Sequence, residues 1–307
     1  MSTVPLSVNA ARALVQDVFC RCGMPEALAA PAAAALVLAE QEGLPSHGLA
    51  RVPFYAAQML VGKVVADAAP RVVRDGAVIG VDAGYGLAFA AIEAGAQAAR
   101  DVVRDLGVAV VSITHSHHFG VAGQAVEPFA RQGLIALALA NAPAAMAPWG
   151  GNRALYGTNP IAFAAPRETG DPLLIDLSLS HVARGKVMLA QKSGQPIPEG
   201  WALDAAGHPT TDADAAMAGT MLPSGGAKGA ALALTVELLT AGLAGGNFAY
   251  QASSLFDDKG PAPDLAHFIL VLDPARFAPG FTDRAEEMFA AIEAQEGARL
   301  PGARRMA

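Results

Sequence analysis

The feature that most constrains the fold is a change in the spacing of apolar residues near Gly62. Before it, apolar residues recur every three to four positions, which predicts helices over residues 8–22 and 25–42 and a third helix capped by Ser46. After it, short apolar runs typical of strands alternate with longer segments of helical spacing. This pattern predicts a helical beginning followed by an α/β region.

The expected strands cover residues 71–74, 77–82, 108–113, 134–140, 161–165, 173–177 and 267–272, and the expected later helices cover 87–106, 121–132, 228–243 and 282–295. At roughly 150 residues per domain, a chain of 307 residues predicts two domains. We expect a helical substrate and dimerisation domain built from both chain ends, 1–65 with 275–307. The central residues 66–274 then form an α/β domain, in which 193–214 is an ordered surface excursion.

Composition narrows the classes of function. The chain is 53% hydrophobic and only 16% charged, which excludes a disordered protein. Its net charge of −7 disfavours nucleic-acid binding, which needs clustered Lys and Arg. The most apolar stretch, 27–39, is shorter than the ~20 residues of a membrane-spanning helix, and the first residues lack the pattern of a secretory signal. We therefore expect a soluble, cytoplasmic protein without a nucleic-acid or membrane partner.

The first segment that suggests chemistry is Ser46-His47-Gly48, followed by Arg51 and Tyr55. A His at the start of a helix can donate a proton, and an Arg one turn later can hold a carboxylate through two parallel hydrogen bonds. The alternative is an ordinary capped helix with exposed polar side chains.

The second segment is His-Ser-His-His-Phe-Gly at residues 115–120, directly after an apolar run. Ligands gather where strands end in open α/β sheets. Three His in four positions allow a metal site and thus a metal-dependent hydrolase, but no Asp, Glu or Cys lies within six residues. Imidazoles that line a ligand pocket, or simple loop polarity, fit this segment better than a metal site.

Two glycine-containing turns follow. Gly-Thr-Asn-Pro at 157–160 precedes a strand and is by itself an ordinary turn. Pro-Ser-Gly-Gly-Ala-Lys-Gly at 223–229 precedes an apolar helix, so its backbone N–H groups and Lys228 suit an anionic phosphate or carboxylate, although a close packing turn explains it equally well. The chain contains no Gly-x-Gly-x-x-Gly, so a conventional Rossmann loop does not bind any dinucleotide here.

Taken together, seven ordered segments resemble the malate/L-lactate dehydrogenase type 2 family over nearly the whole chain: SHGLARVPFY, HSHHFG, MAPWGG, GTNPIAFAAP, IDLSLSHVARGKV, IPEGWALDAAGHPTTD and PSGGAKGAALALTVELL. The resemblance implies an NAD(P)-dependent oxidoreductase that acts on small 2-keto, 2-hydroxy or 2-imino acids. It also implies a non-Rossmann dinucleotide-binding domain with a mixed sheet, and a homodimer.

Within the family, several details resemble the cyclic ketimine reductases: the pair His117-His118, VEPFA at 126–130, GGNF at 245–248 and the ending LPGARR. Such enzymes reduce Δ1-piperideine-2-carboxylate to L-pipecolate and Δ1-pyrroline-2-carboxylate to L-proline, which implies NADPH as cofactor, with NADH open. Ala303 stands where many hydroxyacid dehydrogenases of the family have Glu, whereas Lys186 stands at a position that is acidic in part of the ketimine reductase group. The alternatives are an NAD(P)-dependent 2-hydroxyacid dehydrogenase and a non-catalytic dinucleotide-binding protein.

The resemblance also implies roles for individual residues. His47, paired with Ser46, matches the proton donor, and His118 is a second candidate for that role. Arg51 and Thr158 match residues that bind the substrate acid. No metal ligands are implied, and the positions expected to contact the cofactor are His118, Phe119, Gly120, Asp176, Leu177, Ser178, Lys228, Arg304 and Arg305.

Overall fold

The computed structural model describes residues 5–302, and the chain begins with three helices. These are α1 (Val8–Arg21), α2 (Glu26–Gln41) and, after the short 3-10 turn η1 (Leu49–Arg51), α3 (Val52–Leu60). The hydroxyl of Ser7 accepts from the Ala10 N–H and begins α1. The expected helices near 8–22 and 25–42 are therefore confirmed, and their apolar faces meet around Phe19, Leu36 and Tyr55.

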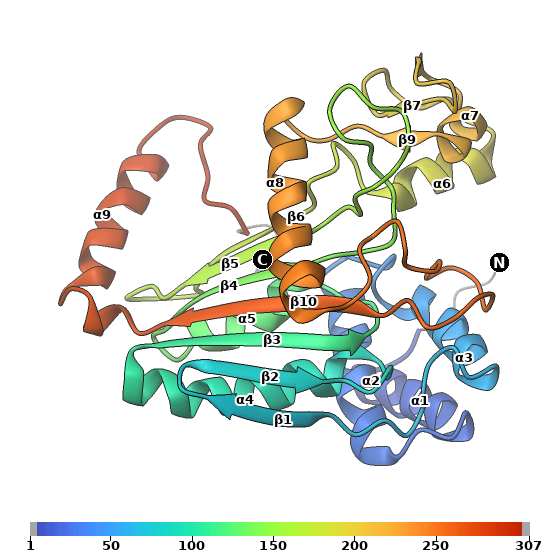
Figure 1. Ribbon diagram of the computed structural model, residues 1–307. Helices are drawn as coiled ribbons and strands as arrows, with labels where there is room; N and C mark the ends of the chain where they lie inside the picture. The colour runs from blue at the N-terminus through green and yellow to red at the C-terminus, as the bar shows by residue number, and fades with distance from the viewer. Residues whose placement is uncertain (1–4, 303–307) are drawn as a thin grey trace.

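A seven-stranded sheet forms the centre of the molecule (Figure 1). Its order is β1-β2-β3-β10-β4-β5-β6, with β1 (Arg71–Asp75), β2 (Val78–Asp82), β3 (Val108–Ser116), β4 (Ile135–Ala140), β5 (Ile161–Ala165), β6 (Leu173–Leu177) and β10 (Leu265–Leu272). Only β2 and β3 pair in parallel. Because β10 is inserted between β3 and β4, the sheet is mixed and differs from the parallel sheet of a Rossmann domain. The α/β class with a mixed sheet is thus confirmed.

One face of this sheet is covered by α4 (Ala88–Leu106) and α5 (Ala122–Ala130). Their buried residues are mostly small, and the backbones approach closely. A Cβ on Gly95 would lie 2.6 Å from Cγ1 of Val111 on β3, so glycine is required where α4 crosses the sheet. Among residues 5–302, no helix is both long and apolar enough to cross a bilayer.

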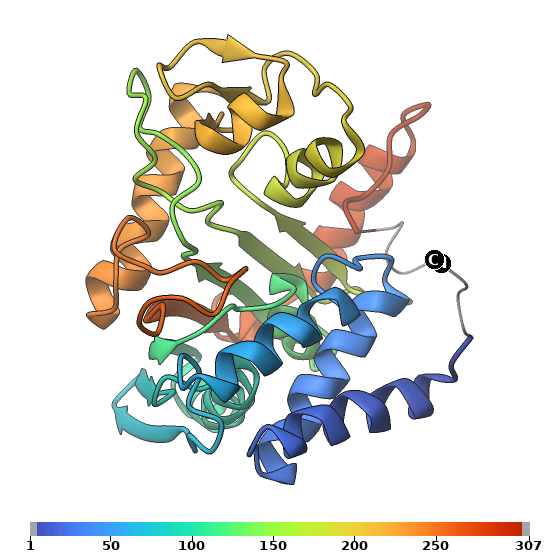
Figure 2. The same cartoon turned by 90° about the vertical axis from the view of Figure 1, so that its right-hand side faces the viewer.

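A second lobe lies above the sheet in Figure 1. It contains α6 (Arg184–Ser193), α7 (Ala213–Ala218) and a small sheet of β7 (Ala202–Leu203), β8 (Pro209–Thr210) and β9 (Thr220–Met221). From this lobe α8 (Ala227–Glu237) runs down to the central sheet, where the π turn η2 (Leu238–Gly242) contacts β10 (Figure 1). The expected excursion 193–214 is ordered and supplies β7 and β8. Figure 2 shows this lobe above α1, α2 and α3.

The last helix, α9 (Phe281–Glu293), follows the 3-10 turn η3 (Pro274–Arg276). Figure 1 shows it at the opposite end of the sheet from α1, α2 and α3. Arg167, just after β5, holds it there through hydrogen bonds of 3.0 and 2.8 Å to the Glu286 carboxylate and through its stacking on Phe289. Within one chain, α9 therefore lies apart from the N-terminal helices, and the domain division into 1–65 with 275–307 and 66–274 stays a prediction.

Candidate active site

The turn that carries Ser46 and His47 lies between α2 and η1. The prediction that Ser46 caps the next helix is wrong, because the Glu40 carboxylate accepts from the Leu49 N–H at 3.0 Å and takes that role. The Ser46 hydroxyl instead lies 3.1 Å from Nδ1 of His47. A Cβ on Gly48 would overlap the Glu40 carboxylate, so a larger residue there would displace the group that accepts from the Leu49 N–H.

Arg51 is the most deeply buried cation beside this turn, with only 6% of its surface exposed. Its Nε donates to the Ser46 carbonyl at 2.7 Å, and the Phe256 ring covers the guanidinium face at 4.5 Å. Burial lowers the pKa of Arg51. Within the described part of the chain its Nη1 is buried without a hydrogen-bond partner. An anionic group that reached Nη1 would supply the missing partner, which fits the expected role in carboxylate binding.

His118 lies against both His47 and Tyr55. Its ring centroid is 5.4 Å from that of His47, with an interplanar angle of 29°, and its Nδ1 is 2.6 Å from the Tyr55 hydroxyl. Burial, and after it the positive charge of Arg51, holds the pKa of His118 well below its usual value. Burial also raises the pKa of Tyr55 to about 12. The phenol and the imidazole are therefore both neutral at neutral pH.

The three His of the 115–120 segment face different partners. His115 Nδ1 is 3.0 Å from the Asp82 carboxylate, whereas His117 is fully buried with its ring edge-on to Tyr55. Burial lowers the pKa of His117 to about 3. Residues 5–302 hold no group of three His, Cys, Asp or Glu side chains placed to bind a metal ion. The metal-dependent hydrolase hypothesis therefore lacks a ligand set in this part of the chain.

Thr158 lies on the turn 157–160, which is stabilised by hydrogen bonds to the buried carboxylate of Glu237. Glu237 of α8 accepts from the Asn159 side chain at 2.8 Å, from the Ala249 N–H at 3.0 Å and from the Gly157 N–H at 3.4 Å. Sequence reasoning missed Glu237, although it is the only charged residue between 229 and 243. A single acidic residue in an otherwise apolar helix indicates a buried carboxylate that accepts several hydrogen bonds.

Two of the expected cofactor segments meet at the start of α5. The Asp176 carboxylate accepts from the Gly123 N–H at 2.8 Å, and the loop 118–120 leads directly into this helix. Phe119 is buried, and Gly120 has a φ of +81° with the Phe89 ring 2.8 Å from the position of a Cβ. Only glycine fits there without strain.

The other expected segments meet near Thr158. The Leu179 N–H donates to the Thr158 carbonyl and the Ser224 N–H to the Leu179 carbonyl, both at 2.8 Å. These bonds place Leu179 between the Thr158 turn and the glycine loop 223–229, and Leu177 and Ser178 directly precede it at the end of β6. Lys228 is exposed in the first turn of α8. A helix start with an adjacent Lys fits the phosphates of a dinucleotide, and Arg304 and Arg305 lie outside the described residues.

A further positively charged segment lies beside Ser46. A Cβ on Gly185, in the first turn of α6, would be 3.8 Å from Cβ of Ser46. Gly185 stands between Arg184 and Lys186. Arg184 is half-buried, donates to the Ala144 carbonyl at 3.1 Å and has its pKa lowered by burial, whereas Lys186 is exposed. Sequence reasoning gave these two cations no role.

Comparison with known proteins gives the same family as the sequence motifs, over nearly the whole chain. The family model described as malate/L-lactate dehydrogenase matches residues 6–307. The (2R)-3-sulfolactate dehydrogenase (NADP(+)) of Chromohalobacter salexigens is 59% identical over 98% of this chain and 91% of that protein. The Δ1-pyrroline-2-carboxylate/Δ1-piperideine-2-carboxylate reductase of Pseudomonas putida is 39% identical over 96% of this chain and 87% of that protein.

Solved structures agree with these relatives. The Δ1-piperideine-2-carboxylate reductase of Pseudomonas syringae has a TM-score of 0.93 and 37% identity, covering 99% of this chain and 92% of that one. The sulfolactate dehydrogenase of Methanocaldococcus jannaschii has a TM-score of 0.90 and 30% identity, covering 98% and 89%. The motif series, the mixed sheet and these similarities agree, and the chain belongs to the malate/L-lactate dehydrogenase family of oxidoreductases.

Proposed function

We propose that the protein is an NADPH-dependent dehydrogenase of a 2-hydroxy acid that carries a second anionic group, of the 3-sulfolactate class. The observation that carries this proposal is that two positively charged segments lie beside Ser46. Arg51 donates to the Ser46 carbonyl and its Nη1 has no hydrogen-bond partner among residues 5–302, and Arg184 and Lys186 flank Gly185, which lies next to Ser46. A carboxylate and a sulfonate match two such regions. The relative at 59% identity is named for this substrate and for NADP(+).

The proton in this reaction is assigned to His47. NADPH, when bound, supplies the hydride that reduces the carbon next to the carboxylate. Ser46 engages Nδ1 of His47, so Nε2 is the nitrogen that would deliver a proton to the substrate oxygen. His118 is the weaker acid candidate, because burial and Arg51 favour its neutral form and the Tyr55 hydroxyl already engages its Nδ1.

Arg51 would orient the substrate. Its Nε is held by the Ser46 carbonyl, which ties the carboxylate site to the turn that carries the acid. A carboxylate bound at Nη1 would therefore keep a fixed relation to His47, and such positioning lowers the barrier to transfer. Thr158, on the turn held by Glu237, is the second expected substrate contact.

A second candidate is reduction of cyclic ketimines, the finer function expected from the sequence details. Reductases of Δ1-pyrroline-2-carboxylate share 36–40% identity with the chain, and one solved reductase has a TM-score of 0.93. These substrates carry one carboxylate, for which Arg51 is sufficient. A protonated imine would gain nothing from Arg184 and Lys186, since like charges repel. The two cations beside Ser46 therefore favour the dianionic acid.

The test is a substrate panel. Purified protein is mixed with NADPH or NADH and with 3-sulfopyruvate, oxaloacetate, pyruvate or Δ1-piperideine-2-carboxylate, and consumption of the reduced cofactor is followed by absorbance. We expect fastest turnover with NADPH and 3-sulfopyruvate. Preference for the cyclic imine would establish the second candidate, and cofactor binding with no turnover of any acid would indicate a non-catalytic dinucleotide-binding protein.

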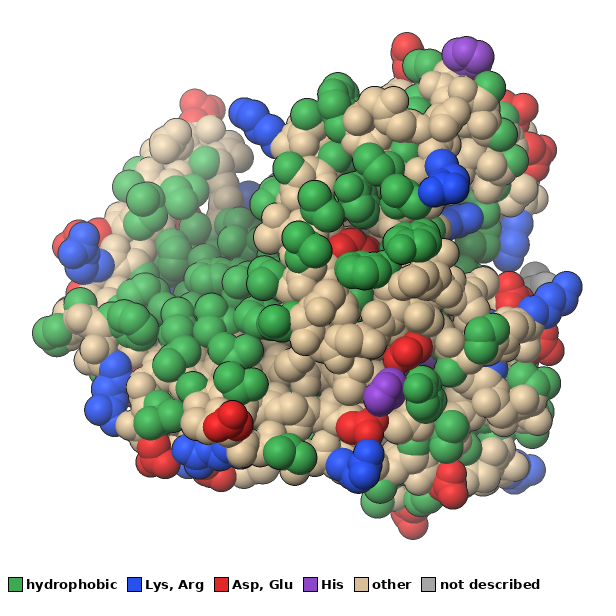
Figure 3. All heavy atoms as spheres, in the orientation of Figure 1, with side chains coloured by type: hydrophobic (Ala, Val, Ile, Leu, Met, Phe, Trp, Pro, Cys, Tyr) green, Lys and Arg blue, Asp and Glu red, His purple; other side chains and the backbone are tan. Residues whose placement is uncertain are grey.

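We also propose that the chain forms the homodimer expected from the family resemblance. The sheet face opposite α4 and α5 carries a row of half-buried apolar side chains, one per strand across β3, β10, β4, β5 and β6: Val110, Leu270, Leu137, Phe163 and Ile175. Figure 3 shows a hollowed, continuous apolar surface over these strands between α8 and α9. A continuous apolar face of this kind is typical of a subunit interface.

Light scattering after gel filtration tests the dimer, with an expected mass of twice 31.2 kDa. Leu270→Glu, which puts a charge in the middle of the row, should shift the protein to the monomer, whereas Leu60→Glu on exposed α3 surface should not. A wild-type monomer would contradict the proposal. The cytoplasmic location stays a prediction.

A further inference from the structure

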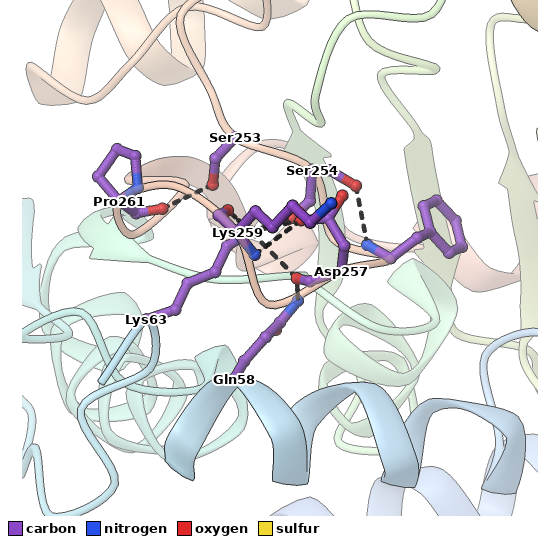
Figure 4. Close-up of polar contacts among 8 residues, drawn as sticks. Gln58, Lys63, Ser253, Ser254, Asp257, Lys259 and Pro261 are labelled. Carbon is purple, nitrogen blue, oxygen red and sulfur yellow. Dashed lines mark hydrogen bonds and ion pairs between the residues drawn. The ribbon is translucent and has the colours of Figure 1, made fainter. Parts of the chain in front are cut away.

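A loop of irregular structure, residues 253–261, lies over the N-terminal helices and is held by a buried lysine. Only 3% of the Lys63 surface is exposed. Its Nζ donates to three carbonyl oxygens of this loop, those of Ser254 at 2.6 Å, Lys259 at 2.7 Å and Asp257 at 3.1 Å (Figure 4). We call residues 253–261 the strap.

The strap has further attachments. The Gln58 side chain, on α3, donates to the Asp257 carbonyl at 2.8 Å, next to the Lys63 contacts (Figure 4). Within the strap, Ser253 donates to the Pro261 carbonyl at 2.7 Å. A buried ammonium is costly unless its three protons are satisfied, and here the strap supplies all three acceptors. Lys63 and the strap therefore require one another.

This arrangement places one strap residue on the substrate-binding arginine. Phe256 lies with its ring 4.5 Å from the Arg51 guanidinium carbon, and its edge meets Phe54 of α3 at 5.9 Å between centroids. The guanidinium is thus fixed along one edge by the Ser46 carbonyl and over one face by Phe256. Nη1, on the remaining edge, has no hydrogen-bond partner among residues 5–302.

We propose that Phe256 is a positioning residue for substrate binding, that it acts through Arg51, and that Lys63 and Gln58 hold it in place through the strap. The proposal rests on the proposed function in one respect, namely that Arg51 binds the substrate carboxylate. It adds that the affinity for the acid depends on an aromatic face that does not itself carry out any chemistry. A ring over a desolvated guanidinium attracts the cation and restricts its side-chain motion.

The test compares Phe256→Leu, which removes the ring and keeps an apolar side chain, with Phe256→Tyr, which keeps the ring. Lys259→Ala is the matched control, because its exposed side chain lies on the same strap. We expect Phe256→Leu to raise KM for the acid about 2- to 30-fold, with kcat and the KM for NADPH changed less than about twofold. Phe256→Tyr should restore the wild-type KM. Equal effects of Phe256→Leu and Lys259→Ala, or a parallel change in both KM values, would overturn the proposal.

The attachment of the strap by Lys63 and Gln58 can be measured without any substrate. Lys63→Met should increase hydrogen–deuterium exchange of peptides that span 253–261 and raise KM for the acid in parallel with Phe256→Leu. Gln58→Met, which removes one bond, is the milder variant if Lys63→Met does not fold. Wild-type exchange in whichever variant folds would overturn the anchoring role.

These tests separate the two proposals. KM is measured on whichever acid the enzyme reduces, so slow turnover of 3-sulfopyruvate alone would count against the proposed function and not against the strap. If no acid is reduced, calorimetric binding of oxalate to the NADP+-loaded protein replaces KM. Weaker binding by Phe256→Leu would then support the strap proposal, and unchanged or absent binding would overturn it.

Discussion

Replacing Glu237 by Gln tests how the Thr158 turn is held. All of the hydrogen-bonding groups around this carboxylate are donors: the N–H groups of Gly157 and Ala249 and the side-chain amides of Asn159 and Asn141. A carboxyl group has acceptor capacity on both oxygens, whereas a glutamine amide accepts on its one oxygen only. A glutamine of the same shape replaces one oxygen by an NH2 group that faces donors.

The size of the effect follows from which groups lose their partner. The Asn159 and Asn141 amides keep second acceptors in the Ala233 and Asn247 carbonyls. One backbone N–H, that of Gly157 or Ala249, and the new NH2 group are left unsatisfied. At about 1–3 kcal/mol for each orphaned buried group, less the relief of burying a neutral side chain, Glu237→Gln should lower the free energy of unfolding by about 2–4 kcal/mol.

The assay is urea unfolding followed by tryptophan fluorescence and circular dichroism, at one protein concentration for all variants. Glu287→Gln, on the exposed side of α9, is the control and should change stability by less than about 0.5 kcal/mol. A Glu237→Gln protein as stable as wild type would refute the reasoning, because the donors would then not depend on a carboxylate.

The pH dependence gives an independent check. Burial raises the pKa of Glu237 above its usual value of 4.5, in spite of its hydrogen bonds. Ionisation of this group therefore disfavours the folded state, and the stability it contributes is complete below pH 4.5 and decreases as pH rises through the raised pKa. The stability advantage of wild type over Glu237→Gln should accordingly shrink from pH 4.5 upward, and an advantage that grows with pH would contradict this sign.

Three other variants test the site. Arg51→Lys should lower kcat/KM for the acid by about 100-fold in steady-state assays, because lysine cannot reproduce the two parallel hydrogen bonds of a guanidinium. The NADPH affinity, measured by fluorescence titration, should stay unchanged, and its loss would instead place Arg51 at the cofactor. Tyr55→Phe removes the 2.6 Å contact to His118 and should reduce kcat/KM about 2- to 10-fold, and an unchanged rate profile would show that this contact is only structural. Gly157→Ala, whose Cβ would overlap the Ala142 carbonyl, should cost about 1–3 kcal/mol in urea unfolding, and an unaffected midpoint would contradict the packing.

Much of the sheet was predictable because its strands are short apolar runs between clear turns. The seven expected strands and the helices α4, α5, α8 and α9 all occur near their expected positions. The insertion of β10 between β3 and β4 was not predictable, because pairing between distant segments leaves no local trace in the sequence. The same holds for α9, whose position depends on the distant Arg167.

The residues of the candidate site also fall into those that the sequence predicts and those that it does not. Ser46, His47 and Arg51 are close in sequence, so one motif predicts their proximity. Lys63, Phe256 and Glu237 act on that site through contacts with residues 80 or more positions away in the chain. The sequence signal for Lys63 and Glu237 is a single charged residue in an apolar run, and Phe256 has no such signal. Contacts that depend on tertiary packing are not visible to periodicity or motifs.

The central claim is that Arg51, together with Arg184 and Lys186 on the segment of α6 next to Ser46, selects an acid with two anionic groups. The most direct test is the ratio of kcat/KM with NADPH for 3-sulfopyruvate over Δ1-piperideine-2-carboxylate. If Arg184 and Lys186 bind the second anionic group of the acid, this ratio should be about 100 or more. It should fall toward one in the double variant Lys186→Ala with Arg184→Ala. A wild-type ratio below one would contradict the claim.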